Sequence, residues 1–125
     1  MNDVHLNILD LSKTLPEPGD VCNLHLFETM VNKAHSFIEE SGDTLEAILV
    51  PGDFNDHSLP AYNLTEPNDK WGQMKETFTT ITGTLAEKFP GVPVLSAVGN
   101  NDCYYHDEAP KVNTETGVVN STQYY

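Results

Sequence analysis

Apolar residues along the chain follow two spacings, and each spacing predicts a different kind of element. Over about residues 23–40 and 68–89 they recur every three or four positions, which predicts two amphipathic helices. Over residues 45–50 and 93–98 they form short runs bounded by turn residues, which predicts buried strands. Because helices that connect strands favour right-handed crossovers, the pattern predicts an α/β fold with a parallel sheet.

Polar residues follow both predicted strands where each apolar run stops. Asp53 comes directly after the first run, with His57 four positions later, and Asn100 and Asp102 follow the second run. In open α/β sheets, ligands bind outside the carboxyl ends of the strands. Carboxylates, imidazoles and amide oxygens are ligands that suit Zn, Mn or Fe. We therefore expect a metal site at this edge of the sheet.

The start of the chain carries a third pair of such side chains, Asp3 and His5, two residues apart. By analogy with the other motifs, we expect a strand before Asp3, most of which would precede Met1. The absence of a visible signal peptide therefore does not decide whether the protein is secreted. Taken singly, each motif also fits an ordinary turn or a chance pairing. The three motifs together, in this order and with helices between the strands, favour a functional site.

These three motifs, D-x-H, G-D-x-x-D-H and G-N-x-D, resemble those of the calcineurin-like metallophosphoesterase superfamily. The segments DVHLN, PGDFNDH and GNNDCYYHDEAP resemble its acid sphingomyelinase-like branch. The resemblance covers all 125 residues and implies a β-sandwich flanked by helices, of which only the N-terminal βαβαβ half is present. The family's later metal motifs contain histidine, and no histidine follows His106. We therefore expect a partial metallophosphoesterase domain over residues 1–125, with an irregular tail over residues 111–125.

The resemblance also implies the activity and its cofactors. It implies hydrolysis of a phosphoric diester, such as one bearing a lipid head group in sphingomyelin, by a hydroxide that bridges two divalent metal ions and attacks phosphorus. Zn is the first expectation for these ions, with Mn or Fe as alternatives. Asp53 would bridge the two ions, Asp3 and His5 would complete one metal site, and Asn100 would serve the other.

Three further residues have expected supporting or catalytic roles. His57 would touch the phosphate or form a hydrogen bond within the site, and Asp102 would orient a ligand or the general acid. The family usually has His where this chain has Asn101, and an amide cannot donate a proton as a general acid. His106, four residues past Asp102, is a possible substitute acid.

The departure at Asn101 leaves two alternatives to a phosphodiesterase. A phosphate leaving group needs no proton, and G-N-N-D also resembles endopolyphosphatases of the same superfamily, which cleave phosphoanhydrides. The other alternative is a non-catalytic binding relative, because the usual acid is replaced and the later metal motifs are absent. On either view the isolated chain can be inactive.

Composition narrows the partners and the compartment. The formal net charge of −13, with only six Lys and Arg, argues against nucleic acid or an anionic membrane as a general partner. No apolar run approaches the roughly 20 residues of a membrane-spanning helix. Two glycosylation sequons begin at Asn63 and Asn120, and the resemblance implies a secreted, lysosomal or vacuolar glycoprotein. Cys22 and Cys103 can form a disulfide or remain free thiols.

Overall fold

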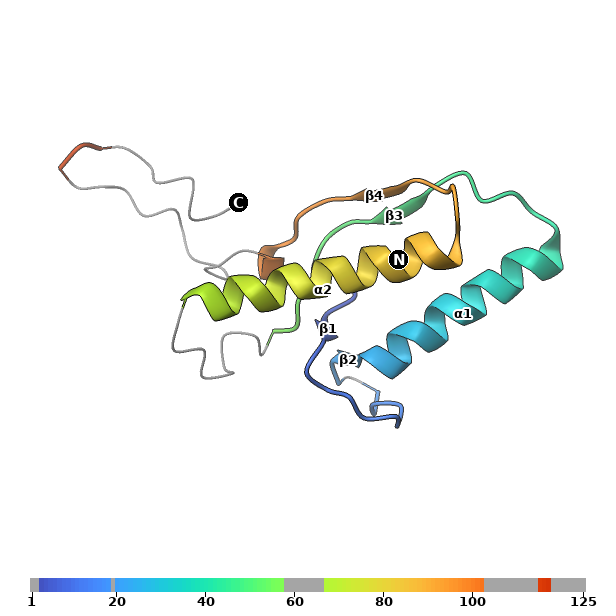
Figure 1. The fold of residues 1–125 in the computed structure, drawn as a ribbon, viewed down its shortest axis with the longest axis horizontal. Helices are drawn as coiled ribbons and strands as arrows, with labels where there is room; N and C mark the ends of the chain where they lie inside the picture. The colour runs from blue at the N-terminus through green and yellow to red at the C-terminus, as the bar shows by residue number, and fades with distance from the viewer. Residues whose placement is uncertain (1–2, 19, 58–66, 103–114, 118–125) are drawn as a thin grey trace.

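The computed structural model describes residues 3–18, 20–57, 67–102 and 115–117 (Figure 1). Within these residues, no helix is both long enough and apolar enough to cross a membrane. The elements are, in chain order, β1 (Leu6–Asn7), β2 (Cys22–Asn23), α1 (Leu24–Ser41), β3 (Ile48–Val50), α2 (Pro67–Lys88), β4 (Val94–Ser96) and the short 3-10 helix η2 (Asn100–Asp102).

The strands pair in parallel, as the sequence predicts. β3 pairs with β4, with Leu49 opposite Leu95, and β1 pairs with β2. A bridge between Leu6 and Asn55 sets β1 beside the segment that follows β3. The protein is therefore a small mixed α/β structure with two helices and short parallel strand pairs, which confirms the α/β prediction at this level.

Helix α1 begins and ends where its local sequence dictates. The Asn23 side chain caps it, because Oδ1 accepts a hydrogen bond from the Leu26 N–H at 2.8 Å. The Nδ2 atom of Asn23 donates to Ser12 Oγ and to the carbonyl oxygen of Thr14, so the cap also anchors the loop before β2. Gly42 ends the helix in a left-handed conformation, with φ of 70°. The predicted helix over residues 23–40 is confirmed.

Helices α1 and α2 run in the same direction, and β3 and β4 return beside each other in the opposite direction (Figure 1). The predicted apolar stripe of α2 is confirmed where its side chains are described, because Met74, Ile81 and Leu85 are almost fully buried. Ile81 and Leu85 pack in one cluster with Phe27 and Val31 of α1 and with Val50 of β3. The core thus lies between the two helices and one face of the strands.

Both central strands are shorter than the apolar runs that predict them. β3 spans three residues rather than 45–50, and β4 spans three rather than 93–98. The two faces of the pair also differ: Val50 is fully buried, whereas Leu49 and Leu95 are 62% and 55% exposed. Asp3 and His5 lie directly before β1, and the described chain contains no strand ahead of them. The expected strand before Asp3 therefore falls outside the described residues.

Candidate functional site

The loops that follow β3 and β4 approach each other so closely that only glycine fits at two positions. Gly52 has φ of 113°, and a Cβ atom there would collide with the backbone of Gly99. A Cβ atom at Gly99 would in turn collide with the backbone and carboxylate of Asp53. These two glycines therefore bring the motif containing Asp53 into contact with the motif containing Asn100.

Three of the expected metal ligands have a left-handed backbone. Asp3, His5 and Asp53 have φ of 46°, 43° and 52°, and among the described non-glycine residues they alone have positive φ. This conformation costs roughly 1–2 kcal/mol per residue for L-amino acids. Such strain persists only where the surrounding structure fixes it, and it clusters at functional sites.

His5, directly before β1, lies beside Asp53 in the loop after β3. The His5 N–H donates to the carbonyl oxygen of Asp53 at 2.9 Å, which fixes the two backbones. The side-chain atoms His5 Nε2 and Asp53 Oδ2 are 3.9 Å apart, and both side chains are only partly exposed. The other carboxylate oxygen, Asp53 Oδ1, accepts the N–H of Asn101 at 3.0 Å. Asp53 thus connects all three motifs.

The orientation of the His5 ring determines which nitrogen atom is available. His5 Nδ1 lies 3.2 Å from the carbonyl oxygen of Asn55. Because a carbonyl oxygen only accepts hydrogen bonds, Nδ1 is the donor in this contact, and Nε2 faces the Asp53 carboxylate. A hydrogen bond of this kind is the usual partner of a histidine that binds a metal.

His57 also reaches this cluster. Its ring stacks on that of His5, with ring centroids 4.3 Å apart and an interplanar angle of 23°. The side chain of His57 lies on the solvent-exposed side of the loop. The structure therefore places His57 beside a predicted metal ligand, in a position to meet a molecule that enters from solvent.

Asp102 holds the two loops together. Its Oδ1 atom accepts hydrogen bonds from the N–H groups of Phe54 and Asn55 and from the side-chain amide of Asn55, at 2.8–3.1 Å. Its Oδ2 atom accepts the N–H of Gly99 at 2.9 Å, and the residue is only 5% exposed. Asp102 therefore acts as a positioning residue for the loops that carry Asp53 and Asn100.

Asn100 and Asn101 occupy the first two positions of η2, and their exposure differs. Asn100 is exposed, whereas Asn101 is 6% exposed. Among the residues that the structure describes, neither polar atom of the Asn101 side chain has a hydrogen-bond partner, and the same is true of Asn55 Oδ1. An unpaired buried polar group costs about 1–3 kcal/mol. The loops therefore hold amide groups that a small polar ligand can satisfy.

The described residues fit a metal ion in part. At a tetrahedral zinc ion, an N and an O ligand about 2.0–2.2 Å from the metal lie about 3.4 Å apart. His5 Nε2 and Asp53 Oδ2 are 3.9 Å apart, so the two side chains are near each other but would have to move closer to share one ion. However, no group of three or more His, Cys, Asp or Glu side chains in the described part of the chain is arranged to hold a metal.

A pocket of about 360 Å³ opens beside the ligand cluster. Its lining combines residues of the cluster with residues of β2 and the first turns of α1, namely Asp3, Val4, His5, Asp20, Val21, Cys22, Leu26, Met30 and His57. β1, β2 and the start of α1 lie together at this end of the molecule (Figure 1). The pocket therefore has a polar end, at Asp3, His5 and His57, and an apolar wall that includes Leu26 and Met30.

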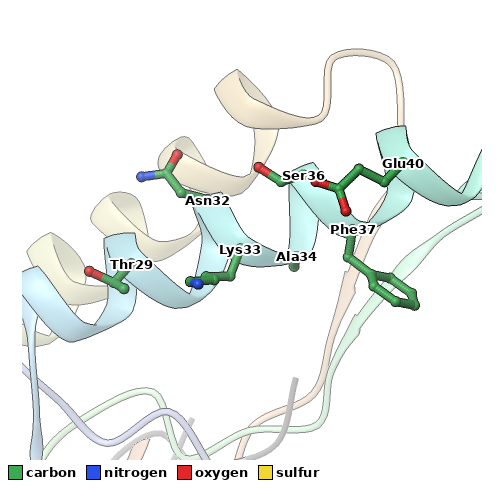
Figure 2. Close-up of a pocket in the computed structure, with 7 residues that line it drawn as sticks. All are labelled: Thr29, Asn32, Lys33, Ala34, Ser36, Phe37 and Glu40. Carbon is green, nitrogen blue, oxygen red and sulfur yellow. The ribbon is translucent and has the colours of Figure 1, made fainter.

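A larger hollow, of about 870 Å³, lies against α1 (Figure 2). Its described lining comes only from α1, where Lys33 and Glu40 supply the charges and the Phe37 ring projects away from the helix. None of the expected site residues in the described part of the chain is among these lining residues. The described candidate residues therefore gather at the strand ends rather than at this hollow.

Sequence reasoning missed the contribution of Asn55 and of the apolar wall at Leu26 and Met30. The helical spacing of Leu26 and Met30, one turn apart, could have indicated a shared face, but nothing in the sequence places that face beside His5. His106, Cys103, both sequons and most of the tail over residues 111–125 lie outside the described residues. No protein-family model matches this chain, and no curated protein matches it significantly.

Proposed function

We propose that this chain carries the first metal-binding edge of a metallophosphoesterase that hydrolyses phosphoric diesters. On this proposal, its βαβαβ arrangement is the N-terminal half of the helix-flanked β-sandwich of that superfamily, in its acid sphingomyelinase-like branch. The observation that carries the proposal is the left-handed backbone of Asp3, His5 and Asp53. These residues are the three to which the family resemblance assigns the metal-bridging carboxylate and its neighbouring metal site.

The strain at these residues supports a functional role. Ordinary turns that require a left-handed φ usually have glycine or asparagine at that position, not histidine. Here the conformation turns His5 so that Nδ1 donates to Asn55 while Nε2 faces Asp53. Strained residues that hydrogen bonds hold in place are typical of functional sites. In such sites the protein side chains already have their binding orientation before the metal ion or substrate arrives.

The described residues would bind the metal ions, hold the loops in position and contact the phosphate. His5 Nε2 and Asp53 Oδ2 would hold the first divalent ion, and the exposed Asn100 would serve the second. Bound ions of this kind supply a hydroxide nucleophile and stabilise the charge on the phosphoryl oxygens. The Asn101 N–H fixes the Asp53 carboxylate, and Asp102 fixes both loops. His57, stacked on His5, would contact the phosphate from the solvent side.

A second candidate function is metal-dependent binding of a phosphate group without catalysis. Asn101 favours it, because this buried amide stands where the family places a histidine acid. Under this alternative the loops bind the ligand and the proton that a leaving group needs is not supplied. Replacing Asn101 with His tests the missing acid. A gain in turnover would show that the lost acid limits the site, whereas no change would fit either a different acid or binding without catalysis.

Asp53→Asn is the test of the proposed function. Asparagine accepts the left-handed backbone but lacks the charge to bind a metal strongly, so we expect metal affinity to fall by more than the roughly 10–100-fold that loss of a hydrogen-bond partner of a ligand costs. Hydrolysis of bis-p-nitrophenyl phosphate should fall by at least about 100-fold with Zn, Mn or Fe. Asp43→Asn, at an exposed turn after α1, is the matched control and should change neither value.

The outcomes of this test are distinct. Equal turnover in Asp53→Asn and in the unmodified chain would contradict the proposed function. Metal binding that depends on Asp53, without turnover in either protein, would support the binding alternative.

A further inference from the structure

We propose that the pocket beside His5 and His57 is a subsite for an uncharged, apolar organic group attached to the phosphorus of the ligand. This inference rests on the proposed function, because it takes the ligand cluster as the place where the phosphoryl group binds. It goes further by naming the chemical class of the group next to that phosphorus. It also selects between an organic phosphoester and a chain of phosphates.

The shape of the pocket suits one small organic group. Its volume of about 360 Å³ lies at the small end of the roughly 300–1,000 Å³ range of ligand pockets. Asp3, His5 and His57 form one end, where the phosphoryl group would bind. A group attached to the same phosphorus would therefore extend toward β2 and α1.

The wall in that direction is apolar and is held in place by the start of α1. Leu26 and Met30 lie one helical turn apart, so their side chains share a face. Val21 and the buried Cys22 continue this surface. Met30 is 38% exposed and unbranched, and methionine adapts readily to the shape of a ligand. The Asn23 cap fixes where this helix begins.

The charges around the pocket argue against a phosphate chain as its occupant. No Lys or Arg is among the described residues that line it, whereas Asp20, which the proposed metal site does not use, contributes a carboxylate. A second or third phosphate group would meet Asp20 and the apolar wall without a cation to neutralise it. Burying such a charge without a partner is strongly unfavourable. An apolar group, in contrast, gains free energy from leaving water.

The test compares two probes with the same phosphonate head group, phenylphosphonate and methylphosphonate, by titration calorimetry on the zinc-loaded full chain. Burial of the phenyl ring should make phenylphosphonate bind at least about 10-fold more tightly than methylphosphonate. Met30→Gln, which keeps the side-chain length and adds an amide, should reduce this preference to about 2-fold or less. Met30→Leu should preserve the preference. Phe37→Gln, at a 70% exposed position on the same helix, is the matched control and should also preserve it.

The same variants should separate binding from turnover. In Met30→Gln, the KM for bis-p-nitrophenyl phosphate should rise several-fold while kcat changes less. A phenyl preference that depends on Met30, in a chain without phosphodiesterase activity, would support the subsite and contradict the proposed activity. Hydrolysis with equal affinity for the two phosphonates would support the activity and overturn the subsite. Tripolyphosphate binding more tightly than phenylphosphonate, or no binding of either phosphonate, would also overturn it.

Discussion

At the scale of single residues, two glycines decide whether the site can form. Gly99 lies against the backbone and carboxylate of Asp53, so an added methyl group at this position forces the two loops apart. We expect Gly99→Ala to lower the free energy of unfolding by about 2 kcal/mol or more, in the range of severe overpacking. Urea denaturation followed by circular dichroism measures this change.

Gly83 provides the matched control for this substitution. It is exposed on α2, and a Cβ atom there would meet nothing within 4 Å. Gly83→Ala should raise the free energy of unfolding by about 0.5–1 kcal/mol, because alanine favours the helix. If both variants change stability equally, the close approach at Gly99 does not matter.

Cys22 makes the stability of the protein depend on alkaline pH. It is a free, buried thiol, and burial raises its pKa from the ordinary 9.0 to about 11. Below pH 9 both the folded and the unfolded chain keep the proton, so stability is unaffected. Between about pH 9 and 11 the Cys22 thiol ionises in the unfolded chain but not in the folded chain. Ionisation therefore stabilises the unfolded chain, and the free energy of unfolding falls as pH rises.

We therefore expect the free energy of unfolding to fall more steeply over this pH interval than it does in Cys22→Ala. Both proteins should carry Cys103→Ser, so that a single thiol differs between them. Identical pH profiles from urea titrations would show that Cys22 ionises freely in the folded chain.

The sequence predicted the residue types at the site better than their geometry. The Gly-Asp and Gly-Asn motifs after apolar runs indicate strand ends, because that pattern is local. The positive φ of His5 is not predictable, since it depends on the hydrogen bond between its ring and Asn55, fifty residues away. The position of Met30 beside His5 depends in the same way on how α1 packs.

At the scale of elements, α1 depends on its N-terminal cap. Asn23 accepts the Leu26 N–H and donates to Ser12 and Thr14, and it is 1% exposed. Asn23→Ala removes the cap and leaves these partners unpaired, so we expect a loss of about 1–3 kcal/mol in the free energy of unfolding. Thermal denaturation measures the effect.

Thr79→Ala on α2 is the control for the cap variant. The Thr79 hydroxyl is exposed and donates to the carbonyl oxygen of Lys75 within the same helix, so its loss should leave stability within about 0.5 kcal/mol. A cap variant no less stable than this control would show that Asn23 does not anchor α1.

Elements set by local signals were predicted closely, and elements set by distant partners were not. Asn23 and Gly42 mark the ends of α1 in the sequence itself, so the predicted helix differs from the observed one by about a residue. The lengths of β3 and β4 depend on their mutual register and on the glycines that turn both chains into the site. The apolar runs over 45–50 and 93–98 therefore overestimate both strands.

At the scale of the whole molecule, one face of the β3–β4 pair is apolar and exposed. Leu49 and Leu95 lie opposite each other at 62% and 55% exposure, although strands of parallel sheets are usually covered on both faces. Exposed apolar surface of this kind promotes association. We expect Leu49→Lys to reduce concentration-dependent self-association, measured by sedimentation velocity, with little change in thermal stability.

Leu11→Lys is the control for this effect, because Leu11 is 75% exposed in the loop after β1. It adds the same charge away from the strand pair. If both lysine variants reduce association to the same extent, net charge rather than the apolar face is responsible.

The hydrogen bonds of Asp102 have a consequence for how the site moves. One carboxylate accepts the amide protons of Phe54 and Asn55 on one loop and of Gly99 on the other. Neither loop can detach without releasing the other, so these three protons should exchange with solvent in a single shared opening event. The site is thus either assembled or lost as a unit, and a ligand that contacts one loop slows the opening of both.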